Sequence, residues 1–377
     1  MQRTPIPNPF VVGKYVSDEY FCDREQETEF LRKQIDNGRN VALISPRRLG
    51  KSGLIQHLFC QPDLLQRYYV FFIDIYATTS LPELVYLMGK AIYEQLKPQS
   101  TRWKERFFQV VRSLQIGYKL DTLGMPTLDL GLGDIVAPQT TLDEIFAYLE
   151  EADRPCIVAI DEFQQIGEYG GLNVEALLRT KIQQCHTTQF IFSGSKRHVM
   201  SLMFNSPSKP FYQSAISMGL DAIPVDTYTD FAQRLFSDYG KQVERDTVER
   251  VWQQYEGYTW YVQMLMNELF ALTPAGGTCT PALIATAEQN VIQTQEAAYK
   301  EILSNLPPRQ KVVLQAIARE GIARNITSAT FIKKYSLGSA SSVQAAVKLL
   351  LKNDIVTHSD GQYRIYDFFF SKWLARY

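Results

Sequence analysis

One stretch constrains the fold more than any other: residues 43 to 55, LISPRRLGKSGLI. It joins an apolar run at 40–45, typical of a buried strand, to a segment at 50–59 that is typical of a helix. Its central octet is Ser45-Pro46-Arg47-Arg48-Leu49-Gly50-Lys51-Ser52, which matches the phosphate-loop consensus G-x-x-x-x-G-K-[ST] except that Ser45 replaces the first glycine. Since such a loop connects a strand to a helix, the stretch predicts an α/β fold.

The predicted loop also has a defined chemistry. Its backbone N–H groups and the helix start would bind phosphate oxygens, with Gly53 as its last residue. Gly50 permits close backbone approach, Lys51 reaches the β- and γ-phosphates, and Ser52 gives a hydroxyl to Mg²⁺. The first glycine mainly eases the turn out of the strand, so a serine there costs little if its φ is negative. We therefore expect an ATP/ADP site with Mg²⁺, against the alternative that Gly-Lys-Ser merely opens a helix.

A second motif supports the first. The apolar run CIVAIDEF, residues 156–163, ends in Asp161 and Glu162, and the carboxyl ends of parallel strands are where α/β proteins bind ligands. Asp161 could hold Mg²⁺, while Glu162 could orient and deprotonate an attacking water. A further apolar run, FIFSGS, places Ser193 and Ser195 where a hydroxyl could contact the γ-phosphate, although Ser-Gly-Ser is also an ordinary turn.

Continuous apolar runs alternate with helical segments over the first two-thirds of the chain, which predicts a parallel sheet with helices on both faces. We assign residues 1–224 to a P-loop ATPase domain. Residues 98–140 form an insertion at its rim, with alternation typical of a β-hairpin. The expected strands lie at residues 40–45, 69–76, 155–163 and 188–195.

The sequence pattern changes near residue 225, from alternating strands and helices to successive helices. Helical patterns dominate residues 225–304, which we predict to be an all-α lid. Residues 305–377 follow a Pro-Pro boundary and show three helical segments and then a short ribbon, the outline of a winged helix-turn-helix. From 306 to 377 there are 11 Lys and Arg against 4 Asp and Glu, although the whole chain has 39 against 40. This module could contact DNA, or it could dock a protein or pack against the lid.

Composition excludes several other classes of protein. The 377 residues are 45% hydrophobic and 21% charged, typical of a soluble protein with a large core. No run approaches 18 apolar residues, and the first 15 residues lack the apolar region of a signal peptide. The 5 cysteines include no C-x-x-C pair, so we expect reduced thiols, a cytoplasmic protein and no membrane partner.

Taken together, these motifs resemble the archaeal-type ATPase family, which are AAA+-related, STAND-like P-loop proteins. The opening motif F-x-G-R-E of that family is matched by residues 21–25, with Asp23 in place of glycine. Its lid motif G-G-x-P is matched at 256–259 with Glu256 first and without the proline. Its C-terminal motif Y-x-[IV]-x-D-P is matched at 363–368 with Phe368 in place of proline.

The resemblance implies a sheet in which the fourth strand lies between the two Walker strands, so that Ser193 or Ser195 is the sensor of the γ-phosphate. It also implies that residues 8–24 line the adenine pocket, which makes Phe10 and Arg24 candidates. For Arg24 a structural ion pair is an equal alternative. Arg47 and Arg48 at the loop tip could meet phosphate, a partner or only solvent.

The leading hypothesis is an Mg²⁺-dependent ATPase that acts as a molecular switch and couples its nucleotide state to the winged helix. One alternative is a slow or non-hydrolysing nucleotide-binding scaffold whose winged helix docks a protein. Another is an ATP-regulated DNA-binding regulator. A homo-oligomer is a further possibility, because no arginine finger can be assigned within the chain and a neighbour could supply it.

Overall fold

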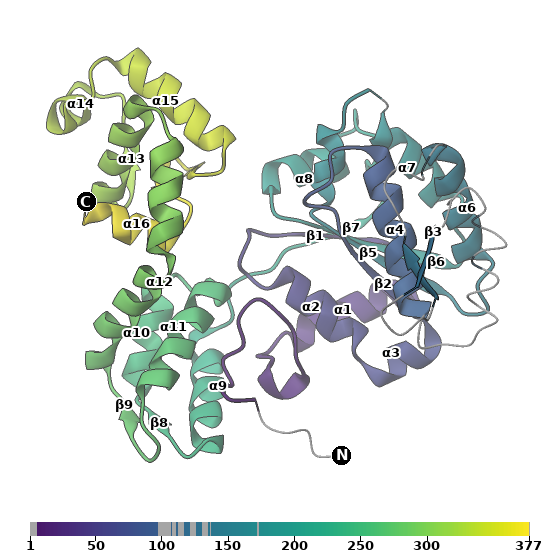
Figure 1. Ribbon diagram of the computed structural model, residues 1–377, viewed down its shortest axis with the longest axis horizontal. Coiled ribbons are helices and arrows are strands. Elements are labelled where there is room, and N and C mark those ends of the chain that lie inside the picture. The colour runs from purple at the N-terminus through teal and green to yellow at the C-terminus, as the bar shows by residue number, and fades with distance from the viewer. Residues whose placement is uncertain are drawn as a thin grey trace. The chain divides into compact units, whose positions relative to one another are not determined.

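The computed structural model describes residues 6–96, 107, 111, 117–120, 126–129, 135, 137–171 and 173–376. Its contacts divide the chain into two compact units, which Figure 1 shows with their elements labelled. Gly13–Ile223 forms one unit; Pro224 and the residues after it form the other. Val12 and the described residues before it belong to this second unit, although the sequence places all of 1–224 in one domain. The three-domain division stays a prediction.

A five-stranded, wholly parallel sheet organises the first unit. Its order is β2-β5-β6-β1-β7, so β6 lies between β1 and β5 as the resemblance implies. The four predicted strands are all present, because each is an apolar run that the sheet buries on both faces. The strands are β1 (Val41–Ile44), β2 (Tyr69–Asp74), β5 (Cys156–Asp161), β6 (Thr188–Gly194) and β7 (Ile216–Met218).

Helices cover both faces of this sheet (Figure 1). Side chains of a strand alternate between faces, so Ile157 and Ala159 of β5 join one core cluster while Val158 and Ile160 join the other. One face is covered by α1 (Glu25–Asp36), α2 (Lys51–Phe59) and α3 (Pro62–Arg67). The other is covered by α4 (Leu81–Leu96), α6 (Pro138–Glu150), α7 (Val174–Gln183) and α8 (Arg197–Asn205). Two 3-10 turns, η1 (Asp18–Tyr20) and η3 (Phe163–Glu168), complete the described elements of the unit.

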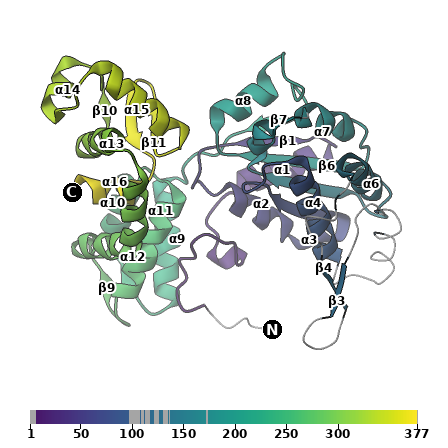
Figure 2. The ribbon, with the colours of Figure 1, turned by 45° about the horizontal axis from the view of Figure 1, so that its top comes forward.

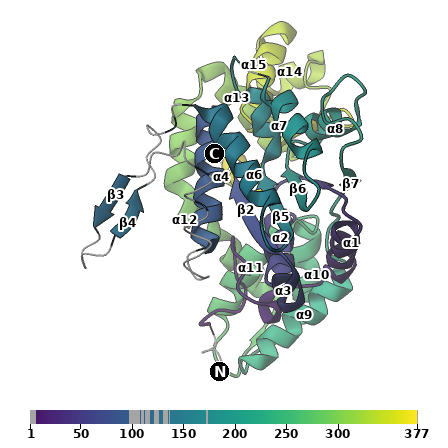
Figure 3. The same ribbon diagram turned by 90° about the vertical axis from the view of Figure 1, so that its right-hand side faces the viewer.

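The described part of the unit has two further groups of strands, an edge strand of the central sheet and a ribbon in the predicted insertion. The edge strand β7 was not predicted, because it has only three residues and Ile216 and Ser217 are exposed, so it lacks a buried apolar run. In the predicted insertion, β3 (Gly117–Leu120) pairs antiparallel with β4 (Pro126–Asp129), and Figure 3 shows this ribbon apart from the central sheet. The turn between them and most of 98–134 lie outside the described residues.

The second unit begins with the predicted lid, seen in Figure 2 as a group of helices. It is not wholly helical, because β8 and β9 form a two-residue parallel pair between Gln242–Val243 and Thr278–Cys279. Across the described residues of both units, no helix is long and apolar enough to cross a membrane. The lid helices are α9 (Val225–Asp238), α10 (Arg245–Gln254), α11 (Thr259–Leu272) and, after the turn η4 (Pro281–Leu283), α12 (Ile284–Asn305).

The C-terminal part of this unit has the predicted winged-helix outline. Serine side chains cap two of its helices: Ser328 accepts a hydrogen bond from the N–H of Phe331, and Ser339 accepts one from the N–H of Ser342. A short strand, β10 (Ala323–Arg324), completes a three-stranded sheet of order β10-β12-β11. The other elements are α13 (Pro308–Glu320), α14 (Ala329–Tyr335), α15 (Ala340–Lys352), β11 (Val356–Ser359), β12 (Gln362–Ile365) and α16 (Phe368–Ala375).

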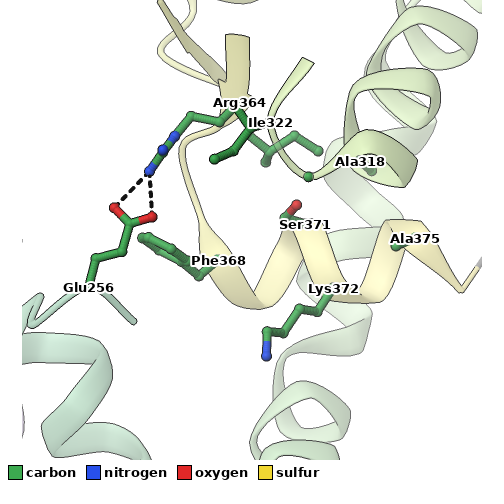
Figure 4. Close-up of a pocket in the computed structure, with 10 residues that line it drawn as sticks. Glu256, Ala318, Ile322, Arg364, Phe368, Ser371, Lys372 and Ala375 are labelled. Carbon is green, nitrogen blue, oxygen red and sulfur yellow. Dashed lines mark hydrogen bonds and ion pairs between the residues drawn. The ribbon is translucent and has the colours of Figure 1, made fainter. Parts of the chain in front are cut away.

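The winged helix is packed firmly against the lid. Phe369 of α16 is fully buried, and its ring centroid lies 5.2 Å from that of Tyr255 and 5.4 Å from that of Tyr261. The neighbouring Phe368, whose ring centroid lies 4.9 Å from that of Tyr261, lines a cavity of about 240 Å³. Nη1 of Arg364, which also lines the cavity, donates hydrogen bonds of 2.8 Å to both carboxylate oxygens of Glu256. Figure 4 draws these two contacts as dashed lines. These aromatic contacts and the Arg364–Glu256 ion pair thus join α16 and β12 to the lid.

Candidate nucleotide-binding site

The loop between β1 and α2 has the backbone shape that phosphate binding requires. Gly50 adopts a left-handed conformation with φ of 95° directly before α2, and Arg48 is also left-handed with φ of 71°. Within the described part of the chain, no side chain caps the N-terminus of α2. The N–H groups of its first turn are therefore available to an anion, and the helix dipole favours negative charge there.

Ser45, which replaces the first glycine of the consensus, fits its position without strain. It is not among the residues with positive φ, so a side chain is tolerated there. Its side chain is 1% exposed, and its hydroxyl donates a 3.0 Å hydrogen bond to the carbonyl of Leu220. Its N–H donates to the carbonyl of Gly194 at 3.3 Å. Ser45 thus joins the end of β1 to the end of β6 and to the segment that follows β7.

Lys51 lies within the loop and is only 5% exposed. Its ammonium donates hydrogen bonds to the carbonyls of Ser45 at 2.8 Å and Pro46 at 2.9 Å. Burial lowers the pKa of Lys51, and the carboxylates of Glu162 and Asp161 oppose that shift. The two carboxylates favour the protonated form of Lys51, and a charged ammonium can donate a strong hydrogen bond to a phosphate oxygen.

Ser52 and Asp161 come together although they are far apart in the sequence. The Ser52 hydroxyl donates a 2.5 Å hydrogen bond to Oδ2 of Asp161, which is 5% exposed at the end of β5. A hydroxyl and a carboxylate are hard oxygen ligands of the kind Mg²⁺ prefers, and Mg²⁺ takes its other ligands from water and phosphate. The pair therefore fits the predicted metal site.

Two side chains hold the carboxylate of Glu162, and a third is joined to it through one of them. Its Oε2 accepts a 2.6 Å hydrogen bond from the hydroxyl of Ser195 and a 2.5 Å one from the amide of Gln164. Nε of Arg47, at the tip of the loop, donates to the same hydroxyl at 3.2 Å. The chain Arg47–Ser195–Glu162 connects the phosphate loop to the ends of β5 and β6.

The two sensor candidates differ sharply in their surroundings. Ser193 is fully buried within β6, and its hydroxyl has no hydrogen-bond partner among the described residues. Ser195 follows β6 and contacts both Arg47 and Glu162. Between them, a Cβ at Gly194 would lie 2.5 Å from side-chain atoms of Gln164 and Met200, so both of these side chains would have to shift.

A family of known proteins matches most of the first unit and the start of the second. Residues 21–265 match the profile of an ATPase domain predominantly from Archaea. The chain belongs to this family. Residues 297–376 match a second profile, described as a probable winged helix domain. No curated protein matches the chain significantly.

Solved structures share the fold of this archaeal-type ATPase over almost its whole length. A Walker-type ATPase of Pyrococcus abyssi has a TM-score of 0.66 and 20% identity, with 98% of this chain and 100% of that chain covered. The ORC2 protein of Aeropyrum pernix, solved as ADPNP–ADP complexes, has a TM-score of 0.61 and 13% identity, covering 98% and 95%. The ORC1 protein of the same organism, solved with DNA, has a TM-score of 0.53 and 12% identity, covering 94% and 92%. These likenesses show the fold alone.

Arg24, in the opening motif of the ATPase, contacts the backbone of the phosphate loop. It is 4% exposed and pairs with Glu27 at 2.6 Å. The same guanidinium donates to the carbonyl of Leu49 in the loop at 3.2 Å and to that of Asp221 at 2.8 Å. The ion pair considered from the sequence is thus present, and a hydrogen bond to the loop backbone accompanies it.

Phe10 lies in the second unit of the ATPase. It is fully buried, with its ring centroid 5.5 Å from that of Phe236 and 6.0 Å from that of Phe270. Core packing therefore accounts for this side chain. Its contact with an adenine base stays a prediction.

Sequence reasoning missed two residues beside the site. Asp74 ends β2 directly opposite Asp161 of β5. Burial raises the pKa of Asp74, and the charges of Asp161 and Glu162 add to that effect. Tyr76, two residues later, lies with its ring centroid 5.3 Å from the guanidinium carbon of Arg47. The signal was available, because FFID at the end of β2 has the same form as VAID at the end of β5.

Proposed function

We propose that this ATPase is a molecular switch that binds ATP with Mg²⁺ in the phosphate loop and hydrolyses it. The observation that carries the proposal is the hydrogen-bonded chain from Arg47 through Ser195 to Glu162. It connects the place where a γ-phosphate would lie to the carboxylate that would activate water. A Gly-Lys-Ser turn that merely begins a helix does not require such contacts with the ends of two other strands.

Each residue has a distinct task in this proposal. Lys51 and the N–H groups at the start of α2 bind the phosphates, while Ser52 and Asp161 hold Mg²⁺. The ion neutralises charge on the phosphate oxygens when it is bound. Glu162 accepts a proton from the attacking water through Oε1, which has no hydrogen bond among the described residues, whereas Oε2 already accepts two.

The coupling to the winged helix rests on the packing inside the second unit. Lys372 of α16 pairs with Glu288 of α12, and the Tyr255 hydroxyl donates to the same carboxylate at 2.8 Å. These contacts, with the buried ring of Phe369, favour a lid and a winged helix that move together. Nucleotide can drive such movement only if it contacts the units differently before and after hydrolysis.

Phosphate release tests the enzymatic part of the proposal. The wild-type protein should release phosphate from ATP, and Glu162→Gln should lower the rate by about 10²- to 10⁴-fold, the usual contribution of a general base, while ATP still binds. Lys51→Ala should abolish binding itself. Equal, slow release by wild type and Glu162→Gln would overturn hydrolysis and leave the alternative of a scaffold that binds nucleotide without turnover.

A groove in the winged helix supports DNA as a second candidate ligand. It has a volume of about 670 Å³ between α15 and the β11–β12 ribbon, with Gln344 and Lys348 on one side. On the other, the rings of His358 and Tyr363 stack at 4.2 Å. Such amide, ammonium and aromatic groups are those that proteins use on nucleic acids. DNA binding should weaken steeply with added salt and weaken on Lys348→Ala; affinity that does not change with salt would exclude it.

The remaining expectations are proposals of the same kind. A cytoplasmic location, a STAND-like mode of regulation and a homo-oligomer that supplies an arginine finger would all fit a switch of this class. The third can be tested directly, because hydrolysis per molecule would then rise with protein concentration. A constant specific activity across a hundredfold dilution would argue against a finger from a neighbouring copy.

A further inference from the structure

Tyr76 is an exposed aromatic residue at the edge of the candidate nucleotide site. It lies two residues beyond the end of β2, and its side chain is 57% exposed. A single exposed ring is ordinary on a protein surface, so exposure alone indicates no function. What distinguishes Tyr76 is its contact with the phosphate loop, because the guanidinium carbon of Arg47 lies 5.3 Å from the centroid of its ring.

The turn that carries Tyr76 is fixed on both sides of that residue. The N–H of Tyr76 donates a 2.9 Å hydrogen bond to Oδ1 of Asp74, and the N–H of Ile75 donates one of 3.2 Å to the carbonyl of Asp161. Thr78 is 3% exposed, and its hydroxyl donates to the carbonyl of Ile75 at 2.6 Å. The backbone of the turn is therefore attached to the sheet, and the ring is presented from a rigid support.

Arg47 is thus held from two directions. Its guanidinium lies over the ring of Tyr76 beyond β2, and its Nε donates to the hydroxyl of Ser195 beyond β6 at 3.2 Å. Each contact removes part of the rotamer freedom of a long side chain. In the sheet order β5 lies between β2 and β6, so the guanidinium is held across the end of β5, where Glu162 follows.

Electrostatics indicate what the held guanidinium would bind. Burial contributes most to the lowered pKa of Lys51, and the positive charge of Arg47 lowers it further, so the two cations act on each other. Glu162, in contrast, would repel the terminal phosphate of a nucleotide. A cation beside Glu162 would offset that repulsion. Arginine suits this task because its guanidinium is always charged and its parallel N–H groups bind phosphate oxygens in pairs.

We propose that Arg47 binds the γ-phosphate of ATP and that Tyr76 positions it for this contact, which makes the site selective for ATP over ADP. The inference rests on the proposed function, in which the γ-phosphate lies beside Glu162. ADP would keep its contacts with Lys51 and the first turn of α2, and it lacks only the phosphate that Arg47 would reach. Arg47 supplies this charge within each molecule, whether or not a neighbouring copy adds an arginine of its own.

Equilibrium binding of two nucleotides tests the role of Arg47. The full-length protein is titrated by calorimetry with ADP and with ADPNP, an ATP analogue that resists hydrolysis, each with Mg²⁺. Arg47→Ala should weaken ADPNP by about ten- to a hundredfold, as expected for the loss of charge-assisted hydrogen bonds, and ADP by no more than about twofold. Equal weakening of both nucleotides, or of neither, overturns the proposal.

Arg154→Ala is the matched control. Arg154 also lies over a tyrosine of β2, with its guanidinium carbon 4.0 Å from the ring centroid of Tyr69. Tyr69 is the first residue of the strand, so this pair lies at the end away from the nucleotide site. The ratio of the two affinities should stay as in the wild type. A change as large as that of Arg47→Ala would mean that the ratio reports a general effect of losing an arginine, and would refute the assignment.

Tyr76→Leu and Tyr76→Phe test the positioning role. Leucine removes the aromatic face, and the preference for ADPNP over ADP should fall by about two- to fivefold, as expected for an exposed cation–π contact. Phenylalanine keeps the ring and should keep the preference of the wild type. Equal loss by both variants, or no loss by either, would contradict the contribution of the ring.

These measurements also separate the inference from the hydrolysis proposed above, because neither nucleotide needs to be turned over. A protein that releases no phosphate from ATP, yet loses its preference for ADPNP with Arg47→Ala, would retain the γ-phosphate contact and refute hydrolysis. A protein that hydrolyses ATP while Arg47→Ala leaves the preference unchanged would retain the proposed function and refute the role of Arg47.

Discussion

The hydroxyl of Ser195 is the most informative single atom to remove from the ATPase. It is the link between Arg47 on the phosphate loop and the carboxylate of Glu162. Ser195→Ala deletes that link without adding bulk. Gln164 would then be the remaining donor to Glu162 among the contacts described above.

The size of the effect follows from the type of bond. A hydrogen bond to a charged group is worth about 1.5–3 kcal/mol, and the Ser195–Glu162 contact is of this kind. If the bond is needed to aim the carboxylate in the transition state, its full value appears in the barrier. Since 1.36 kcal/mol is a factor of ten in rate, kcat should fall by about 10- to 150-fold. The KM for ATP should change little, because Lys51 and the loop backbone are untouched.

A steady-state assay of phosphate release, with ATP binding measured separately, gives both numbers. Ser193→Ala is the matched control, because it removes a nearby hydroxyl, within β6, that has no hydrogen-bond partner among the described residues. It should leave kcat within about twofold and stability equal or slightly higher. The reasoning fails if Ser195→Ala raises kcat, which would mean that the contact restrains Glu162, or if the two variants lose activity equally.

Three further predictions concern stability and reactivity. Gly194→Ala should lower the free energy of unfolding by about 1–3 kcal/mol in denaturant titration, because its Cβ would overlap Gln164; an unchanged midpoint would contradict the packing. Glu256→Gln and Arg364→Gln should show a coupling energy of about 0.2–1 kcal/mol in a double-mutant cycle, since both side chains are partly exposed. Burial raises the pKa of the Cys156 thiol to about 12, so it stays protonated at pH 8. Mass spectrometry after iodoacetamide should find exposed Cys60 alkylated first.

The fold could be predicted largely from the sequence because its central strands are buried on both faces. Such strands are apolar throughout, so 40–45 and 188–195 stand out without any alignment. The edge strand β7 could not be found in this way, since Ile216 and Ser217 are exposed and its only pairing is to a distant strand. The pairing of residues 242–243 with 278–279 was hidden for the same reason, because two residues carry no periodic pattern.

Individual residues of the candidate site could be predicted from the sequence, but the contacts between them could not. Lys51, Ser52 and Asp161 lie in motifs whose chemistry can be read locally. The link from Arg47 to Ser195 joins residues 148 positions apart, and only the sheet order brings β6 beside β1. Arg24 shows the same limit: its hydrogen bond to the carbonyl of Leu49 depends on where a backbone oxygen points, which no residue type reveals.

The junction between lid and winged helix bears on how a switch could act. If the Pro-Pro boundary near 307 were the only connection between them, the winged helix could move independently of the lid. Instead, Phe369 and Leu374 of the last helix are fully buried, and full burial of one such side chain stabilises by about 1.5–3 kcal/mol. Detaching the helix would expose both, together with the rings of Tyr255 and Tyr261. Any movement of the lid that keeps this packing would therefore carry the winged helix with it.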